Sequence, residues 1–243
     1  MRGPLRAIFF DLDGTLHHGR ELVMSVVARV ARAAACQDPR LDPARLAEVY
    51  WRVAWEHWGD GYLVNHSSGE ELRLLTWQEA LSELGVHDGD LPARIAREYA
   101  REIHRTYHLQ AEAPRVIAAL RRRRHVGLIT NGFSDIQWAK IEQLGLRDLL
   151  DPLIVSQDVG FAKPDPRIFA VALERVGCSA EEAAHVGDSL ADDVAGARGA
   201  GLFAVWLRPP GRTLPPGATE PDRVATSLEG VLNIVRERER GGP

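Results

Sequence analysis

The chain has 243 residues, of which 45% are hydrophobic and 26% charged, with a net charge of -4 at pH 7 and an isoelectric point near 6.1. This length allows one large domain or two small ones with a proper core, and the composition is typical of globular proteins. The lack of a basic excess argues against a nucleic-acid partner, and no window approaches the roughly 18 apolar residues of a membrane span.

The first predicted element is a short buried strand, because the apolar run from Leu5 to Phe10 is rich in bulky side chains and too short for a helix. Asp11 and Asp13 follow it directly, and Gly14 then allows a turn. A solvated Asp-Gly turn is one interpretation. However, unpaired carboxylates at a buried strand end are costly without a cation or dense hydrogen bonds, and open α/β sheets bind ligands at the carboxyl ends of strands. We therefore interpret the pair as part of a functional site.

Residues from Glu21 to about Tyr107 have the spacing of amphipathic helices, with apolar residues recurring at intervals of three and four. Asp42-Pro43 and Ser67-Ser68 supply two helix starts, the second with glutamates three residues further on. We predict a bundle of about four helices, inserted after the first strand as residues 17–110.

From Ala111 onward the pattern alternates between helix and strand. The predicted helices are 114–124, 135–144, 166–176, 189–200 and 228–236, and the predicted strands are 125–129, 153–155, 183–186 and 202–207. Single helices between strands imply parallel βαβ units. The sequence therefore predicts an α/β protein, in which residues 1–16 and 111–243 form a doubly wound, Rossmann-like parallel sheet core and residues 17–110 an inserted α-helical domain.

Two later stretches offer groups suited to an anion. Thr130-Asn131-Gly132 ends a predicted strand and combines a hydroxyl, an amide and backbone N–H donors, although an ordinary Asn-Gly turn looks the same. Lys163 precedes two prolines at the start of a predicted helix. A rigidly placed ammonium group suits phosphoryl chemistry, while the alternative is a solvated lysine.

A fourth stretch returns to carboxylates. Asp188 follows an apolar strand, and Asp192 and Asp193 come one helical turn later. Asp188 is expected to join Asp11 and Asp13 in an all-oxygen site, which suits Mg²⁺. Acids favoured by a helix N-terminus are the alternative for the later pair, and we interpret Asp192 as a surface residue.

In this order, Asp11-x-Asp13, Thr130, Lys163 and Asp188 resemble the motifs of the haloacid dehalogenase (HAD) superfamily of phosphohydrolases. The resemblance implies that Asp11 is the nucleophile and Asp13 the general acid/base. It also implies that Thr130 and Lys163 hold the phosphoryl group, with Asn131 and Gly132 N–H groups as further donors. In the family an acid at the place of Asp193 orients the lysine or a metal-bound water.

The resemblance further implies a Mg²⁺-dependent phosphomonoester hydrolase that acts on a small phosphorylated metabolite through an aspartyl-phosphate. Mg²⁺ would be held by Asp11, Asp188 and the backbone carbonyl of Asp13, and the helical insert would be a cap that selects the substrate. Family dehalogenases lack an acid where Asp13 stands, which favours phosphate chemistry. A phosphosugar mutase and a non-catalytic binding protein of this fold remain alternatives. A phosphonate hydrolase is disfavoured because the insert has no lysine between Glu21 and Tyr107.

Other features are less informative. Trp51, Trp55 and Trp58 share one face of a predicted helix, which is typical of core packing but makes them our first hypothesis for substrate contacts. The arginine run 121–124 ends a predicted helix, where cations are favoured, and we interpret it as solvated.

Cysteine usage bears on the compartment. Cys36 and Cys178 lie far apart without a CxxC pattern, which favours a reducing environment, and the N-terminus runs directly into the first predicted strand without room for a signal peptide. We expect a cytoplasmic monomer or homodimer with no membrane or nucleic-acid partner.

Overall fold

The structure is a computed structural model that describes residues 4–17, 20–57, 68–87 and 89–239. The chain divides into two compact units. The core unit comprises Met1–His18, His108–Gly132 and Gln137–Pro243, and the helical unit comprises Gly19–Tyr107 with Phe133–Ile136.

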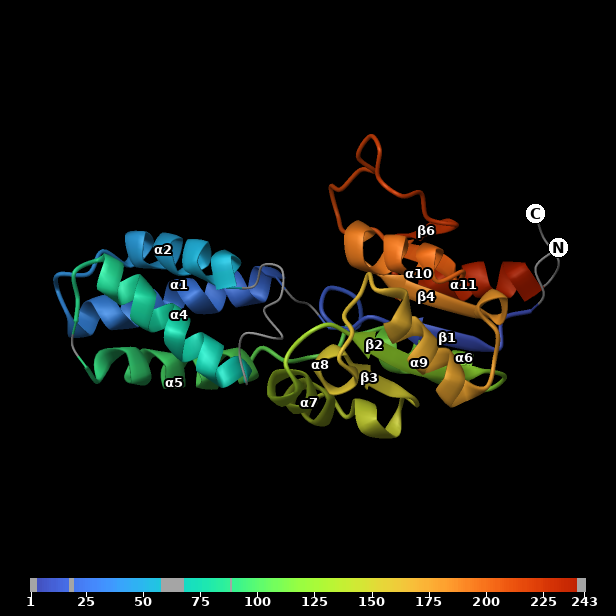
Figure 1. Cartoon of the computed structure of the whole chain (residues 1–243), viewed down its shortest axis with the longest axis horizontal. Coiled ribbons are helices and arrows are strands. Elements are labelled where there is room, and N and C mark those ends of the chain that lie inside the picture. Colours follow the sequence, from blue (N-terminus) through green and yellow to red (C-terminus); the bar gives the residue numbers. More distant parts are fainter. Residues whose placement is uncertain (1–3, 18–19, 58–67, 88, 240–243) are drawn as a thin grey trace. The chain divides into compact units, whose positions relative to one another are not determined.

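The core unit is built on one six-stranded sheet in which every pair of neighbours is parallel (Figure 1). In chain order the strands are β1 (Ala7–Phe10), β2 (His125–Thr130), β3 (Leu153–Val155), β4 (Ala183–Gly187), β5 (Phe203–Leu207) and β6 (Arg223–Ala225). Their order across the sheet is β3-β2-β1-β4-β5-β6. The strand order reverses beside β1, so the predicted doubly wound α/β sheet is confirmed, and β1, β2 and β4 end side by side where such folds bind ligands.

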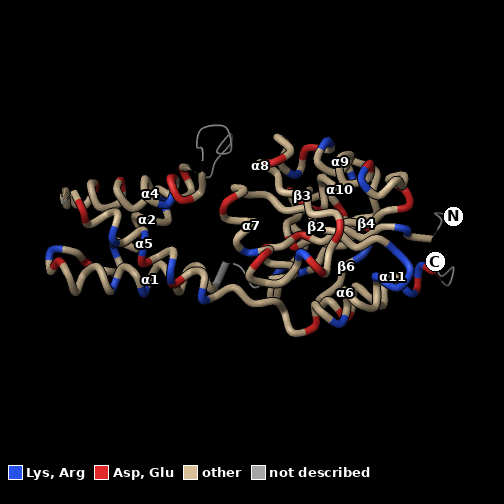
Figure 2. The backbone as a smooth tube through the Cα atoms, turned by 90° about the horizontal axis from the view of Figure 1, so that it is seen from below, with Lys and Arg blue, Asp and Glu red and all other residues tan. Residues whose placement is uncertain are grey.

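Helices cover both faces of this sheet. Figure 2 shows α9 (Pro166–Val176) and α10 (Ala195–Gly199) on one side and α6 (Ala113–Arg121) and α11 (Leu228–Glu239) on the other. On the first face Phe9, Ile129 and Phe169 are fully buried in one apolar cluster. Burial of apolar surface on both faces is the main stabilising contribution, and it explains why the central strands are apolar throughout instead of alternating.

Several details differ from the predicted elements. The first strand begins at Ala7, and its neighbour Leu5 is buried but outside the strand. The short helix α8 (Ser156–Val159) and the edge strand β6 have too few residues for a periodic signal. The predicted helix 189–200 is divided into a π-helical turn, Leu190–Val194, and α10.

The helical unit contains four long helices among its described residues: α1 (Arg20–Gln37), α2 (Pro43–His57), α4 (Gly69–Glu83) and α5 (Leu91–His104). The predicted caps form, since Asp42 Oδ1 accepts a hydrogen bond from Arg45 N at 2.7 Å and Ser68 Oγ accepts one from Glu71 N at 3.1 Å. Trp77 is fully buried in this bundle.

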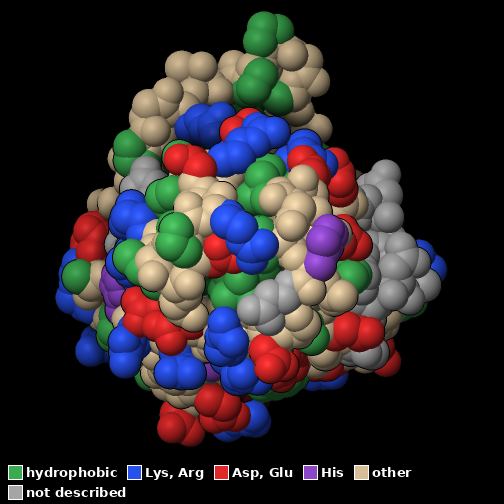
Figure 3. All heavy atoms as spheres, turned by 90° about the vertical axis from the view of Figure 1, so that its left-hand side faces the viewer, with side chains coloured by type: hydrophobic (Ala, Val, Ile, Leu, Met, Phe, Trp, Pro, Cys, Tyr) green, Lys and Arg blue, Asp and Glu red, His purple; other side chains and the backbone are tan. Residues whose placement is uncertain are grey.

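The surface of the helical unit is charged and mixed in sign. Figure 3 shows positive and negative side chains interspersed on one face of the molecule, and pairs such as Arg29–Glu102 at 3.1 Å account for this pattern. Of the three tryptophans on the predicted face, Trp51 is half-buried, Trp55 is 58% exposed and Trp58 lies outside the described residues. Within the described part of the chain, no helix has the length and apolar character needed to cross a bilayer.

Candidate active site

The loop after β1 places the first two aspartates. Asp11 N donates to Val186 O of β4 at 2.9 Å, which continues the pairing of the sheet. The chain then turns sharply, with three successive amides, from Thr15 to His17, donating to Leu12 O. Gly14 has φ +92°, a conformation that L side chains rarely adopt. The turn therefore requires glycine and brings Asp13 back toward the end of the strand.

Gly14 is needed for a second reason, which is the close approach of Asp188. A Cβ atom at position 14 would lie 2.6 Å from Asp188 Oδ2, so any larger residue would displace this carboxylate. Asp188 follows β4, the neighbour of β1, as predicted from the ends of parallel strands. The two aspartate-bearing loops thus fit together because one of them carries no side chain at the contact.

Lys163 joins two of the predicted carboxylates. Its Nζ lies 2.6 Å from Asp11 Oδ1 and 2.7 Å from Asp193 Oδ1, and the residue is only 4% exposed. Charge-assisted hydrogen bonds at these lengths are strong, and a buried ammonium group needs such partners. Lys163 and Asp193 therefore hold the Asp11 carboxylate in one orientation.

Asn131 positions the backbone of Lys163. Its Oδ1 accepts a hydrogen bond from Lys163 N and its Nδ2 donates to Lys163 O, both at 2.8 Å. The amide side chain is thus used to align the lysine. The Gly132 N–H, predicted as a phosphate donor, donates in this structure to Ser156 Oγ at 2.9 Å.

Asp193 is buried by a local departure from α-helical geometry. Ser189 O accepts hydrogen bonds from both Asp193 N and Val194 N in the π-helical turn, and Ser189 N donates to Asp193 Oδ2 at 3.0 Å. Such turns are frequent at functional sites. A Cβ atom on Gly187 would lie 2.1 Å from Asp193 Cγ, so this glycine makes room for the carboxylate.

His185 on β4 completes the surroundings of Asp193 and was not predicted from the sequence. Its Nε2 lies 2.9 Å from Asp193 Oδ1, and the residue is 1% exposed. Burial lowers the pKa of His185 more than Asp193 raises it, so the ring is neutral and donates through Nε2. A single histidine in an otherwise apolar strand is a sequence signal that would have identified it.

The charges of this cluster do not balance. Asp11, Asp188 and Asp193 place carboxylate oxygens within 4.8 Å of one another, with Lys163 as the cation between two of them. Burial raises the pKa of Asp11, and the charges of Asp193 and Asp188 add to this effect against that of Lys163. Burial and the charge of Asp193 likewise raise the pKa of Asp188 to about 6.

A divalent cation would relieve this excess of negative charge. Carboxylate oxygens are the ligands that Mg²⁺ prefers, so the chemistry of the donors fits the predicted metal. Asp193 differs from the other two carboxylates because three donors already bind its oxygens. Burial would raise its pKa, but Lys163 and His185 lower it, and we assign Asp193 to holding Lys163.

Gln137 links Thr130 to Asp13, and Lys140 also binds Asp13; the sequence analysis singled out neither residue. Gln137 Nε2 donates to Thr130 Oγ1 and, at 3.1 Å, to Asp13 Oδ2. Lys140 Nζ lies 2.8 Å from Asp13 Oδ1 and 2.6 Å from Oδ2. Burial would raise the pKa of Asp13, but the charge and hydrogen bonds of Lys140 and the bond from Gln137 together lower it.

Both residues belong to α7 (Ser134–Gln143), the helix after β2. They were missed because polar residues three positions apart look like the solvated face of a surface helix. Only the packing of the fold buries Gln137, which is 1% exposed.

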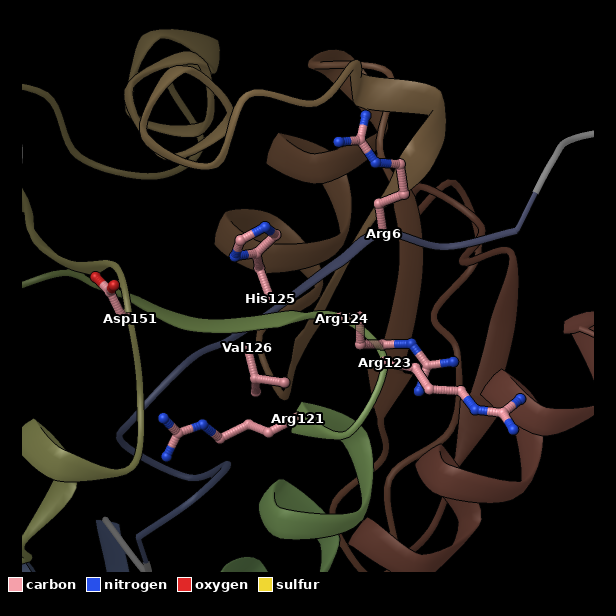
Figure 4. Close-up of a pocket in the computed structure, with 7 residues that line it drawn as sticks. All are labelled: Arg6, Arg121, Arg123, Arg124, His125, Val126 and Asp151. Carbon is pink, nitrogen blue, oxygen red and sulfur yellow. The ribbon is translucent and has the colours of Figure 1, made fainter.

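A pocket of about 450 Å³ lies at the opposite, amino ends of the strands (Figure 4). It is lined by Arg6, Arg121, Arg123, Arg124, His125, Val126 and Asp151. Arg6 pairs with Glu182 at 3.2 Å, Arg124 pairs with Glu239, and Arg121 donates to Asp148 O at 2.8 Å. We do not assign the active site here, because its charges are partly compensated and none of the predicted site residues lines it.

Comparison with known proteins gives consistent relatives. A family model described as haloacid dehalogenase-like hydrolase matches residues 5–201. The chain is 33% identical to the phosphoserine phosphatase of Thermus thermophilus over 84% of this chain and 88% of that protein. It is 32% identical to the glyceraldehyde 3-phosphate phosphatase of Methanothermobacter thermautotrophicus, with 84% and 85% covered. The crystal structure of a 2-haloacid dehalogenase from Pseudomonas syringae has a TM-score of 0.69 at 28% identity, covering 96% of this chain and 99% of that one.

Proposed function

Because the chain belongs to the haloacid dehalogenase-like hydrolase family and is a phosphatase within it, we propose that it hydrolyses a small phosphorylated metabolite through an aspartyl-phosphate intermediate, with Mg²⁺ as cofactor. The observation on which this depends is the arrangement around Asp11, a buried carboxylate fixed by Lys163, with Asp13 two residues further along.

In the first half of the reaction, an oxygen of Asp11 attacks phosphorus while the bond from phosphorus to the leaving oxygen breaks. The aspartyl-phosphate that forms is one of the standard covalent carboxylate intermediates. Asp13 gives its proton to the leaving oxygen, and the alcohol departs. In the second half, Asp13 takes a proton from water, the water oxygen attacks phosphorus, and Asp11 is released with inorganic phosphate.

The remaining groups bind and orient the phosphoryl group. The Thr130 hydroxyl and the Lys163 ammonium are proposed to hold its outer oxygens, with the backbone N–H of Asn131 as a further donor. The Gly132 N–H would have to leave Ser156 Oγ to serve as another. Phosphoryl transfer depends mainly on such positioning and on charge stabilisation. Asp193 contributes indirectly, by fixing Lys163 at 2.7 Å.

Mg²⁺ would be held by carboxylate oxygens of Asp11 and Asp188 and by the backbone carbonyl of Asp13. When bound, it reduces the repulsion between an anionic nucleophile and an anionic substrate. The raised pKa values of Asp11 and Asp188 support this assignment, since both carboxylates must be ionised for the reaction and lack sufficient positive charge nearby.

The substrate class rests on the relatives, two of which are phosphatases named for phosphoserine and for glyceraldehyde 3-phosphate. Both names denote small phosphate monoesters. We propose that the helical unit, residues 17–110 by sequence, is the cap that selects among such compounds.

The test is the release of inorganic phosphate from a panel that includes phosphoserine, glyceraldehyde 3-phosphate, sugar phosphates, nucleotides and p-nitrophenyl phosphate. The panel is run with Mg²⁺ and with EDTA, for the native protein, Asp11→Asn and, as a matched control, Asp192→Asn. We expect metal-dependent release that Asp11→Asn lowers to the level without enzyme and Asp192→Asn retains. A folded native protein that releases phosphate from no member of the panel would contradict the proposal.

Two other activities would give different products. A phosphosugar mutase would convert a sugar phosphate to its isomer with little free phosphate. A dehalogenase would release halide from 2-haloacids, and the presence of Asp13, held by Lys140 and Gln137, favours phosphate chemistry instead.

A further inference from the structure

Lysine is almost absent from this protein. Of the 30 basic Lys and Arg residues, 28 are arginine and only Lys140 and Lys163 are lysine. Both lysines bind aspartates of the proposed active site: Lys163 binds Asp11, and Lys140 binds Asp13. A chain that uses arginine at nearly every basic position thus keeps the compact ammonium group at the two places where it touches these carboxyls.

The contact of Lys140 with Asp13 is close and well protected. The ammonium reaches both carboxylate oxygens, at 2.8 and 2.6 Å, and the lysine side chain is only 12% exposed, whereas that of Asp13 is 37% exposed. The lysine therefore supports the carboxyl from the protein side, and part of Asp13 is left accessible to a substrate.

The two oxygens of Asp13 are not equivalent. Oδ2 accepts from Lys140 and from Gln137 Nε2, while Oδ1 accepts only from Lys140 among the hydrogen bonds of the described residues. Two donors occupy Oδ2, so the geometry favours Oδ1 as the oxygen that exchanges a proton. Since Gln137 also donates to Thr130 Oγ1, it links Asp13 to a proposed phosphate ligand.

We propose that Lys140 is a positioning residue, which acts with Gln137 to fix the Asp13 carboxyl group so that Oδ1 exchanges the proton with the leaving group. The inference rests on the proposed role of Asp13 as general acid/base. It adds to that role the residues that orient the carboxyl and the oxygen that reacts.

The test uses the dependence of kcat/KM on the leaving group. An alkyl phosphate needs a proton on its leaving oxygen, whereas p-nitrophenolate leaves readily without one. We compare an alkyl phosphate with p-nitrophenyl phosphate in the native enzyme, Asp13→Asn, Lys140→Met and Lys140→Gln. Arg147→Met is the matched control, because it removes an exposed cation that pairs with Glu142 rather than Asp13.

General acid catalysis contributes roughly 10²–10⁴-fold, so Asp13→Asn should lower kcat/KM for the alkyl phosphate by about that factor and affect p-nitrophenyl phosphate much less. Misplacement of a catalytic group costs up to about 10²-fold, so both Lys140 variants should show the same selectivity with a smaller loss, mainly in kcat. Arg147→Met should behave as the native enzyme does.

Chemical rescue of a Lys140 variant distinguishes a positioning role of Lys140 from a general loss of structure. In a Cys36→Ser, Cys178→Ser background, Lys140→Cys treated with 2-bromoethylamine regains an ammonium group of nearly lysine length, and iodoacetamide adds a neutral group of similar size. We expect only the first treatment to restore the alkyl phosphate rate. This comparison stays informative if Lys140→Met is unstable.

The outcomes separate this inference from the proposed function. If Asp13→Asn is selective for the alkyl phosphate and the Lys140 variants lower both substrates equally or neither, the positioning role is wrong and the role of Asp13 stands. If Asp13→Asn shows no selectivity, the acid/base role of Asp13 fails and this inference fails with it.

Discussion

At the carboxyl ends of β1 and β4, three carboxylates share one ammonium group, whereas at the amino ends of β1 and β2 four arginines line an open pocket. Figure 2 shows basic residues gathered around α11, near the two termini, at the side of the core unit where that pocket lies. The arginine pocket has a volume of about 450 Å³. Two of its four arginines, however, pair with Glu182 and Glu239, and Arg121 donates to a carbonyl oxygen, so part of its charge is already compensated.

The carboxylate cluster differs in two physical respects. Two of its three carboxylates, those of Asp11 and Asp193, are buried, and its negative charge exceeds the positive charge of Lys163. Buried, uncompensated charge is costly, and folded proteins retain it mainly where a ligand or a reaction uses it. On this comparison, the balance of charge favours the carboxylate cluster as the proposed site of chemistry.

At the acidic end, the largest expected effect on stability is that of Asp193→Asn. The substitution removes the negative charge that pairs with Lys163 and replaces one of the two acceptor oxygens by an amide NH2 group. We expect it to lower the free energy of unfolding by about 3 kcal/mol, the cost of breaking a buried pair. Phosphate release should fall by about 10²-fold, because Lys163 loses its alignment. Urea unfolding and the phosphate assay measure the two effects.

Asp192→Asn is the control for that experiment. Asp192 is adjacent in sequence, is only partly buried, and accepts a bond from Ser189 Oγ at 3.1 Å. The Asp192→Asn variant should retain phosphate release and lose little stability. Equal effects of the two variants would mean that the π-helical turn, rather than the buried carboxylate, is what matters.

Gly187→Ala tests whether the Asp193 carboxylate packs directly against Gly187. The added methyl group would meet Asp193 Cγ at 2.1 Å, so the carboxylate must move. We expect a loss of about 1–3 kcal/mol, typical of overpacking, together with reduced activity. Gly199→Ala, in α10 with open space around its Cβ position, is the matched control and should be tolerated.

Some residues of the candidate site could be predicted from the sequence, and the physical reason differs from residue to residue. Asp11, Thr130 and Asp188 were expected to meet because parallel strands end at the same edge of a sheet, and the structure places all three there. Lys163 lies on a loop, and its position depended on motif resemblance instead.

The residues that sequence analysis missed are those whose burial depends on tertiary packing. Gln137 and Lys140 lie on a helix whose polar face would be solvated if nothing packed against it. The π-helical turn at Leu190–Val194 is set by Ser189 and Gly187 together, and no helical period reveals it. The rarity of lysine was the one available sequence signal for Lys140.

The cluster of carboxylates should also respond to pH in the metal-free protein. Burial and Asp193 raise the pKa of Asp188 from 3.8 to about 6, so the folded state binds more protons than the unfolded state between these values. Stability from this group is therefore present at low pH and lost as the pH rises through about 6. In EDTA, Asp188→Asn should stabilise the protein by roughly 1–2 kcal/mol at pH 7.5, after allowance for partial exposure, and by little at pH 4.

Mg²⁺ should stabilise the native protein more than it stabilises Asp188→Asn. Addition of Mg²⁺ at pH 7.5 is expected to raise the melting temperature of the native protein and to have little effect on Asp188→Asn, because a ligand that binds only the folded state stabilises it. A native melting temperature that Mg²⁺ does not change would contradict the assignment of the metal to Asp11 and Asp188.

The smallest effect is expected at the basic end of the sheet. Arg123 lines the pocket of Figure 4, and its side chain points away from Asp151 there. Arg123→Glu should change stability and phosphate release by no more than about 0.5 kcal/mol, or about twofold, as surface substitutions usually do. The contrast with Asp193→Asn tests the comparison directly, since each variant alters one charged residue and the two lie at opposite ends of the same sheet. A large loss of phosphate release in Arg123→Glu would show that the arginine pocket contributes to the reaction although its charge is partly compensated. The balance of charge would then not suffice to locate function in this fold.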